Sequence, residues 1–267
     1  GVELEAAAPD VSSGRYETSA GTDVVALTAT TFGADQADTV DEFRAGGGLP
    51  NALPSVGPVV LNEIHYHPAL GDDEFLELYN LTDSAITLHD GGLGSGWTIR
   101  GIQNAGGTAD FQLDAGAIIP AKGFLLVVGI DPAAFRSSHG LPANVPIVGP
   151  YSGGIDNSGE RIELFRPAPA GRILVDQVRY NDRDPWPLAP DGQGPSLERI
   201  QAFQYGNDPV NWSASVVAGG TPGGPNSATP PSGGNVAPVA SFTVRPASGT
   251  APLDVFLVRK LGVPGHP

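Results

Sequence analysis

Short β-prone runs that end at turn-forming residues recur along the chain from Val59 to Ile200. Nearly all are bounded by Gly, Pro, Asp or Asn, and each of these residues ends a strand for its own physical reason. The chain has 37 Gly and 26 Pro among 267 residues, a composition typical of many loops and little helix. The sequence therefore predicts an all-β protein, an immunoglobulin-like β-sandwich of about nine strands, and argues against a parallel sheet with crossover helices.

The predicted strands are Val59 to Tyr66, Glu74 to Asn80, Ala85 to Leu88, Trp97 to Gly101, Ala117 to Ile119, Phe124 to Val128, Arg161 to Phe165, Ile173 to Tyr180 and Ser196 to Ile200.

One short helix interrupts this pattern, in the sequence DPAAFRSSHG. Asp131 can accept hydrogen bonds from the free amides of the first turn, and Pro132 suits the first helical position because its φ is fixed. Gly140 can take the left-handed conformation that ends a helix. We expect about two turns that cover one end of the sandwich.

Four parts follow from shifts in composition along the chain. Residues 1–57 are expected to be the remnant of a preceding module plus a linker, with one strand at 22–29 and a short helix or turn at 37–43. Residues 58–227 form the sandwich. The density of Gly, Pro and Ser from Gly219 to Asn235 is typical of an interdomain linker. We place this linker at 228–235, between the sandwich and a partial β module at 236–267.

The charge balance limits the partners of the chain. Its 14 Lys and Arg against 29 Asp and Glu give a formal charge of −15, which disfavours nucleic-acid phosphates and anionic lipid surfaces. Cationic partners and divalent metal ions fit that charge better. No apolar run approaches the roughly 20 residues that span a bilayer, so we expect no membrane insertion.

Two residue types are absent from the sequence. The lack of cysteine excludes disulfides and thiolate metal sites. The lack of methionine, even at position 1, leads us to expect a chain that begins inside a longer precursor with any signal peptide upstream.

Eight motifs occur in the order typical of one family, over roughly residues 58–227. They are VVLNEIHYHP (59–68), EFLELYNLTDSAITLHDGG (74–92), GWTI (96–99), IPAKGFLLVV (119–128), GERIELF (159–165), VDQVRYNDRDPWP (175–187), DGQGPSLERI (191–200), and NWSAS (211–215) with GGTPGGPN (219–226). Together they resemble the lamin tail domain, and the bacterial exported type most of all. The resemblance implies an immunoglobulin-like module of a larger secreted or cell-surface protein.

A second resemblance lies near the end of the chain. The sequence APVASFTVRPASGTAPLDVFL (237–257) is similar to the start of a PKD domain, another extracellular β-sandwich, and the pattern is lost after Leu257. This resemblance implies a truncated PKD-like fragment and a multidomain, extracellular or cell-surface architecture.

The first motif contains a candidate metal site. Strict strand alternation would place Glu63, His65 and His67 on one face, together with Val59 and Leu61. Both imidazoles could then reach one ion, with Glu63 as a third ligand. The alternative, which we favour, is that the histidines lie near the end of the strand and bond to loops.

Two acidic turns offer hard oxygen ligands that suit calcium, the only cofactor candidate. Asp72 and Asp73 lie in the first, and Asp182 and Asp184 in the second. Neither turn has EF-hand spacing, and Asp is also an ordinary turn former.

Glu63 and Glu77 can be compared with the paired acids of a glycoside hydrolase. We favour a structural role, in which each carboxylate bonds backbone amides or pairs with Arg161 or Arg199. The sequence also lacks a G-x-S-x-G nucleophile elbow and a phosphate-binding loop with its lysine.

Three tryptophans, Trp97, Trp186 and Trp212, are candidates for a carbohydrate platform. Aromatic residues at such positions more often close the ends of a sandwich as core, which is the alternative we favour.

These observations predict a protein that is not an enzyme, a structural, adhesion or protein-interaction module of a larger exported or cell-surface protein. The expected partners are other domains of the same polypeptide, surface proteins or polysaccharide. Two alternatives are an accessory polysaccharide-binding domain of a secreted hydrolase and a surface-fibre subunit that assembles by strand addition. A metalloenzyme that uses Glu63, His65, His67 and the turn at 72–74 is the least favoured.

Overall fold

The computed structural model describes residues 8–30, 51–104, 106–107, 109–228, 242–245 and 256–259. The chain divides into two compact units, Gly1–Thr229 and Pro230–Pro267. In the second unit, β17 (Phe242–Arg245) and β18 (Phe256–Arg259) form an antiparallel pair. The helix or turn predicted at 37–43 lies outside the described residues.

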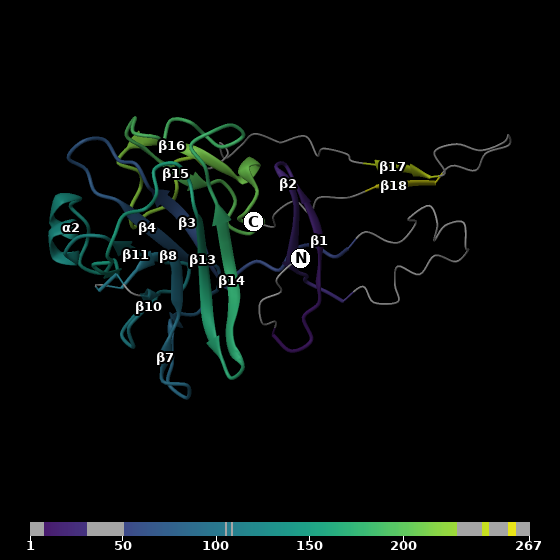
Figure 1. The fold of residues 1–267 in the computed structure, drawn as a ribbon, viewed down its shortest axis with the longest axis horizontal. Helices are drawn as coiled ribbons and strands as arrows, with labels where there is room; N and C mark the ends of the chain where they lie inside the picture. Colours follow the sequence, from purple (N-terminus) through teal and green to yellow (C-terminus); the bar gives the residue numbers. More distant parts are fainter. Residues whose placement is uncertain are drawn as a thin grey trace. The chain divides into compact units, whose positions relative to one another are not determined.

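The first unit contains a six-stranded sheet with the strand order β12-β11-β4-β3-β15-β16 (Figure 1). All its pairs are antiparallel except β11 with β12. The strands are β3 (Val59–His65), β4 (Phe75–Asn80), β11 (Phe124–Val128), β12 (Ile147–Val148), β15 (Pro195–Arg199) and β16 (Trp212–Ala218).

A four-stranded sheet with the order β14-β13-β8-β9 forms the second layer. Its strands are β8 (Thr98–Gln103), β9 (Asp110–Gln112), β13 (Arg161–Ala168) and β14 (Gly171–Arg179). Smaller elements are the pairs β5 (Ile86–Thr87) with β10 (Ile118–Ile119) and β6 (His89–Asp90) with β7 (Ser95–Gly96), and the 3-10 helix η1 (Pro209–Asn211).

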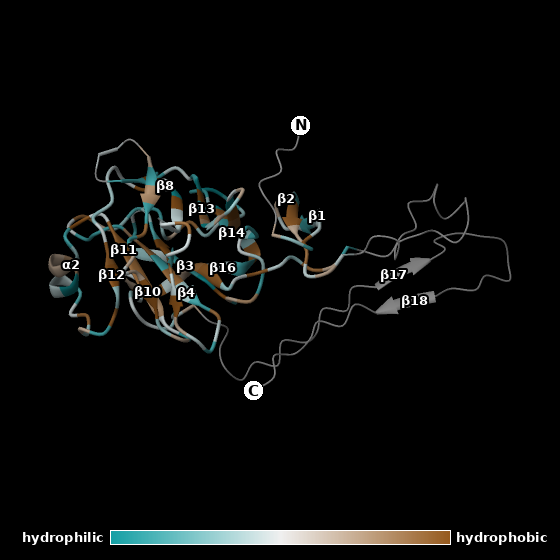
Figure 2. Ribbon diagram, turned by 90° about the horizontal axis from the view of Figure 1, so that it is seen from below, coloured by the Kyte–Doolittle hydropathy of each residue, from teal (hydrophilic) through white to brown (hydrophobic). Residues whose placement is uncertain are grey.

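The core lies between these two sheets. Leu61 and Leu78 from the first sheet belong to the same buried cluster as Ile99, Leu164 and Val178 from the second. Hydrophobic residues gather on β3, β4 and β11, as Figure 2 shows. The predicted all-β, immunoglobulin-like sandwich is confirmed, and the described residues include one short α-helix.

Each of the nine predicted runs contains a strand, with ends that differ by a few residues. Six strands of the first unit were missed: the two-residue strands β6, β7 and β12, and the longer strands β1 (Ser13–Thr18), β9 and β16. The sequence of β16 is WSASVVA, in which Trp212 is buried while Val216 and Val217 are exposed. It is an edge strand with little apolar alternation, which explains why its sequence gave a weak signal.

The predicted helix is present as α2 (Pro132–Ser138). Asp131 accepts hydrogen bonds from the amides of Ala133 and Ala134, and Gly140 has a φ of +61° just beyond the C-terminal end. Phe135 packs against Phe75 on the face of the six-stranded sheet that is turned away from the main core. The helix therefore covers one end of that face.

The first unit also contains the hairpin of β1 and β2 (Gly21–Ala26). Asp23 accepts hydrogen bonds from Tyr205 and from Asn207, and Tyr16 packs edge-on against Tyr205. The hairpin is thus held against the loop that precedes η1, and residues 8–30 pack with the sandwich in one unit.

A β-bulge interrupts the alternation of β3. Leu61 pairs with Leu78 and Glu63 pairs with Glu77, so Asn62 is an extra residue between them. The prediction that Glu63 and His65 share a face with Val59 and Leu61 is therefore wrong. Val59, Leu61 and Ile64 belong to the core, whereas Glu63 and His65 lie on the opposite face.

A buried ion pair satisfies the backbone of the bulge. The Leu61 amide donates to Asp176 Oδ2 over 2.8 Å, and Arg199 Nη1 donates to the Leu61 carbonyl over 3.0 Å. Arg199 Nη1 also lies 2.7 Å from Asp176 Oδ2. Because Asp176 is on β14 and Arg199 on β15, this pair joins the two sheets through the point where β3 is irregular.

We expect Arg199→Met to lower the free energy of unfolding by about 3–5 kcal/mol, since it leaves the buried Asp176 carboxylate without its partner. Urea unfolding measures the loss. The double variant Arg199→Met with Asp176→Asn should lose less than the sum of the single variants. Arg183→Met, at an exposed position, is the matched control and should change stability by less than about 0.5 kcal/mol. A loss below about 1 kcal/mol in Arg199→Met would contradict this role for the ion pair.

Candidate functional site

Three buried glutamates form a row across adjacent strands of the six-stranded sheet. Glu77 on β4 is directly opposite Glu63 on β3, and Glu63 is directly opposite Glu198 on β15. Each is 0% exposed, although all three lie on the face turned away from the core. The outer face of a sandwich is normally solvated, so a further segment must cover the row. We call these residues the glutamate row.

The covering segment is Gly219–Ala228, which we call the strap. Its backbone amides donate to each member of the row: Thr221 to Glu63 over 2.8 Å, Gly223 to Glu77 over 2.6 Å, and Ala228 to Glu198 over 2.6 Å. The side chains of Ser196, Thr221 and Ser227 donate further hydrogen bonds to Glu63 and Glu198. Each carboxylate therefore fixes one point of the strap to the sheet.

The bulge takes part in the same network. The Asn62 side chain donates to Glu77 Oε1 over 2.8 Å and to Asn226 Oδ1 over 2.7 Å. Asn226 in turn donates to the carbonyls of Asn62 and Arg199. The extra residue of β3 thus contacts both the glutamate row and the strap.

Glycine is required where the strap approaches the row. Gly220 has a φ of +73°, and a Cβ at that position would lie 2.0 Å from Glu63 Oε1. The composition from Gly219 onward is typical of a linker, but residues 219–227 pack on the sheet, within the range 58–227 expected for the domain. Their glycines permit a positive φ and a close packed approach, whereas a composition argument assigns the same residues to a flexible chain.

Burial dominates the electrostatics of the row. Burial, with a smaller contribution from the neighbouring Glu198, raises the pKa of Glu63 to about 7, against hydrogen bonds from Ser196 and Thr221 that lower it. Burial also raises the pKa of Glu77 well above its ordinary value, and Glu63 adds to that effect. At pH values between the ordinary and the raised pKa, Glu63 and Glu77 therefore stay protonated in the folded protein, whereas they are ionised in the unfolded chain.

The candidate metal ligands of β3 do not converge. His65 is buried, with Nε2 3.2 Å from the Gly194 carbonyl oxygen and its ring edge-on to Phe75, and burial lowers its pKa. His67 Nδ1 lies instead 2.6 Å from Asp191 Oδ1. In the described part of the chain, no group of three or more His, Cys, Asp or Glu side chains is arranged to hold a metal ion.

The acidic turns have local partners. Asp72 lies 3.6 Å from His139 Nε2 and accepts a hydrogen bond from the Asp73 amide. Asp182 lies 3.4 Å from Arg183 Nε, and Asp184 is exposed. Binding of calcium at either turn stays a prediction.

The tryptophans do not form an exposed platform. Trp97, Trp186 and Trp212 are all buried in the main core. The rings of Trp186 and Trp212 lie 6.3 Å apart, and Trp212 Nε1 donates to the Gly206 carbonyl over 2.6 Å. A sugar ring stacks on an exposed aromatic face, so the structure argues against this candidate and favours the core alternative.

Sequence reasoning identified Glu63 and Glu77 and foresaw that they bond backbone amides. Neither pairs with an arginine, because Arg199 pairs with Asp176, and Arg161 lies 3.6 Å from Glu163. The third member of the row, Glu198, was missed. Its pairing with Glu63 depends on the register between two strands that lie far apart in the sequence.

Residues 53–182 match the family model described as Lamin Tail Domain. The resemblance to that family is therefore confirmed over these residues. No curated protein and no solved structure matches the chain. The match ends before β15 and β16, which complete the six-stranded sheet and contribute Glu198.

The pH dependence of Glu63→Gln tests the electrostatics of the row. A carboxyl whose folded pKa is about 7 instead of 4.5 destabilises the folded state increasingly as pH rises between those values. The neutral variant escapes this loss. We expect its free energy of unfolding to rise relative to the parent chain by up to about 3 kcal/mol from pH 4.5 to 8, since one pKa unit is about 1.4 kcal/mol.

Urea unfolding at several pH values measures this difference. Glu17→Gln, which removes an exposed carboxylate on β1, is the control and should give a flat difference. A flat or falling difference for Glu63→Gln would show that Glu63 has no raised pKa.

Proposed function

We propose that this chain is a non-catalytic structural and interaction module of a larger exported or cell-surface protein. The match of residues 53–182 to the lamin tail domain and the immunoglobulin-like sandwich support such a module. One observation carries the proposal: the carboxylates that most resemble catalytic acids each hold a backbone amide of the strap. Among the described residues, the strap lies over all three carboxylates and binds them through its amides.

The strap gives the module a fixed exit. Its amides are bound at three points on three adjacent strands, so the chain that follows Ala228 leaves from a defined place on the sheet. A module that the chain leaves at a fixed point can hold the start of the next segment in place and transmit mechanical tension to it. This suits a domain that spaces or presents other parts of the same polypeptide.

An exported, multidomain setting is supported by the bacterial type of the first resemblance and by the PKD-like sequence at 237–257. The strand β17 lies within that sequence, and its antiparallel partner β18 begins at the last two residues of it. In the described residues, no helix has the length and apolar character needed to cross a membrane.

Assembly into fibres by strand addition at β16 is the weaker alternative. Val216 and Val217 are exposed at this edge of the sheet, which favours pairing with a further strand. However, the Val216 amide already donates to Ser227 Oγ over 2.8 Å. The end of the strap thus occupies part of the edge that an added strand would need.

An activity screen tests the proposal. We expect the purified chain to give no turnover above the buffer rate with ester, peptide, glycoside and phosphodiester substrates, with or without Ca²⁺, Mg²⁺ or Zn²⁺. Glu198→Gln should lower the free energy of unfolding by about 1–3 kcal/mol, because an amide nitrogen replaces an oxygen that accepts hydrogen bonds. The activity of His65→Ala is measured in the same screen. Turnover that disappears in Glu63→Gln while the variant stays folded would contradict a non-catalytic role.

A further inference from the structure

The outer face of the four-stranded sheet gathers arginines, although acidic residues outnumber basic ones by 29 to 14 in this chain. Ile162, Leu164 and Val178 of β13 and β14 point into the core, so their neighbours on these strands point outward. Four arginines on β8, β13 and β14 lie on this outer face: Arg100, Arg161, Arg172 and Arg179.

Two of the four have a structural role. Arg100 Nη1 lies 2.5 Å from Glu163 Oε2, and Arg172 Nη1 lies 2.7 Å from Asp110 Oδ2. Both guanidinium groups also lie over the ring of Phe165, at 4.9 and 4.1 Å from its centre. Their charges are matched within the protein, and their positions are fixed by the aromatic ring.

The other two face each other without such matching. Arg161 and Arg179 are directly opposite on β13 and β14, and both are exposed. The nearest acid to Arg161 is Glu163, at 3.6 Å, which Arg100 already engages. Among the residues that the structure describes, the Arg179 guanidinium has no ion-pair or hydrogen-bond partner. Like charges directly opposite each other destabilise a sheet, and a bound anion would remove this repulsion.

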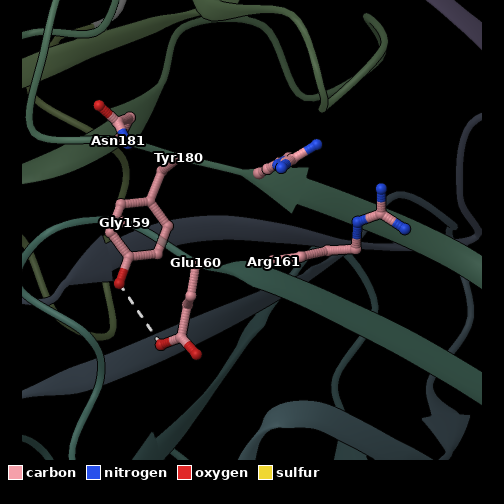
Figure 3. A pocket seen from close by; sticks show the side chains of 6 residues that line it. Gly159, Glu160, Arg161, Tyr180 and Asn181 are labelled. Atoms are coloured by element: carbon pink, nitrogen blue, oxygen red, sulfur yellow. Dashed lines mark hydrogen bonds between the residues drawn. The ribbon is translucent and has the colours of Figure 1, made fainter.

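A hollow of about 330 Å³ lies beside this pair, where β13 begins and β14 ends. Among its other polar side chains, Glu160 accepts from the Asp156 amide and from Tyr180, both at Oε1, and Asn181 donates to the Ser158 carbonyl. Figure 3 shows Glu160 turned toward Tyr180, while the Arg161 guanidinium points to the other side. The cationic groups of this hollow are therefore Arg179 and Arg161, and among the described residues Arg161 keeps only its 3.6 Å ion pair with Glu163.

A second hollow, of about 270 Å³, shares Arg179 with the first. Thr22, Asp23 and Asn207 contribute polar groups to its wall. Trp186, which is buried in the core, and Pro209 also line it, but none of the large apolar side chains that are exposed in the described residues lines either hollow. Protein interfaces depend on buried aromatic and apolar anchors, whereas this surface offers hydrogen-bonding groups on both sides of a charge. It suits an extended, hydroxyl-rich polymer that carries spaced anionic groups.

We propose that Arg161 and Arg179 bind a carboxylate or sulfate group of an acidic polysaccharide. Two guanidinium groups can donate parallel hydrogen bonds to the two oxygens of such a group. Nucleic acid is disfavoured because its closely spaced phosphates would be repelled by the net charge of −15 on the chain. This inference rests on the proposed interaction role and names the ligand class for it.

Binding of the full chain to four defined polymers tests the proposal: polygalacturonate for carboxylate, heparin for sulfate, dextran as a neutral glycan, and a DNA duplex. We expect polygalacturonate or heparin to bind, and the anionic polymer that binds more tightly identifies the anionic group. Affinity should fall at least about tenfold in Arg161→Glu with Arg179→Glu, and it should weaken as salt rises. The charge-preserving Arg161→Lys with Arg179→Lys should retain an intermediate affinity, because lysine cannot form the paired contact.

Arg15→Glu with Arg183→Glu is the control, with the same change of charge at two exposed positions outside the first hollow, and should stay within about twofold of the parent. Equal losses in control and test variants, unchanged affinity in the test variant, or equal binding of dextran or DNA would overturn the proposal. Thermal unfolding of each variant verifies that the fold is kept. If no glycan binds while the activity screen stays blank, this inference fails and the non-catalytic module stands.

Discussion

The β-bulge at Leu61–Glu63 is the constraint on which the rest of the structure depends. By inserting Asn62, it keeps Leu61 and Ile64 in the core and turns Glu63 outward. A bulge leaves backbone groups without ladder partners, and buried groups of this kind are costly unless they are bonded. Asp176 satisfies the Leu61 amide from across the sandwich, Arg199 satisfies the Leu61 carbonyl from the neighbouring strand β15, and Asn226 satisfies the Asn62 carbonyl from the strap. The bulge thus connects both sheets and the strap.

The glutamate row follows from this geometry. Three carboxylates on neighbouring strands repel one another and lose hydration, which is why the pKa values of Glu63 and Glu77 are raised. The strap offsets this loss by directing three amides at them. Acidic pairs of this kind suggest catalysis when read as sequence, but here they anchor a chain. On the opposite sheet, two like charges, Arg161 and Arg179, face each other, and Arg161 has only the 3.6 Å ion pair with Glu163 among the described residues.

Features that depend on local sequence could be predicted. Asp131 and Pro132 define the start of α2, and apolar runs such as 124–128 define strands, because capping and alternation act over a few residues. Features set by long-range pairing could not. The register of Glu198 against Glu63, and of Arg161 against Arg179, requires knowing which strands meet. The strap has the composition of a linker, whereas the structure uses its glycines for close packing. Composition alone does not distinguish these two uses, and it was the motif GGTPGGPN that placed residues 219–226 with the domain.

Amide hydrogen exchange of Thr221, Gly223 and Ala228 tests most directly whether the strap is fixed by the glutamate row. If it is, these three amides exchange only when the domain unfolds, with a free energy close to that of Ile64 in the centre of β3. Exchange within roughly tenfold of the unstructured rate, while Ile64 remains protected, would contradict the account, because the strap would then open independently of the sandwich.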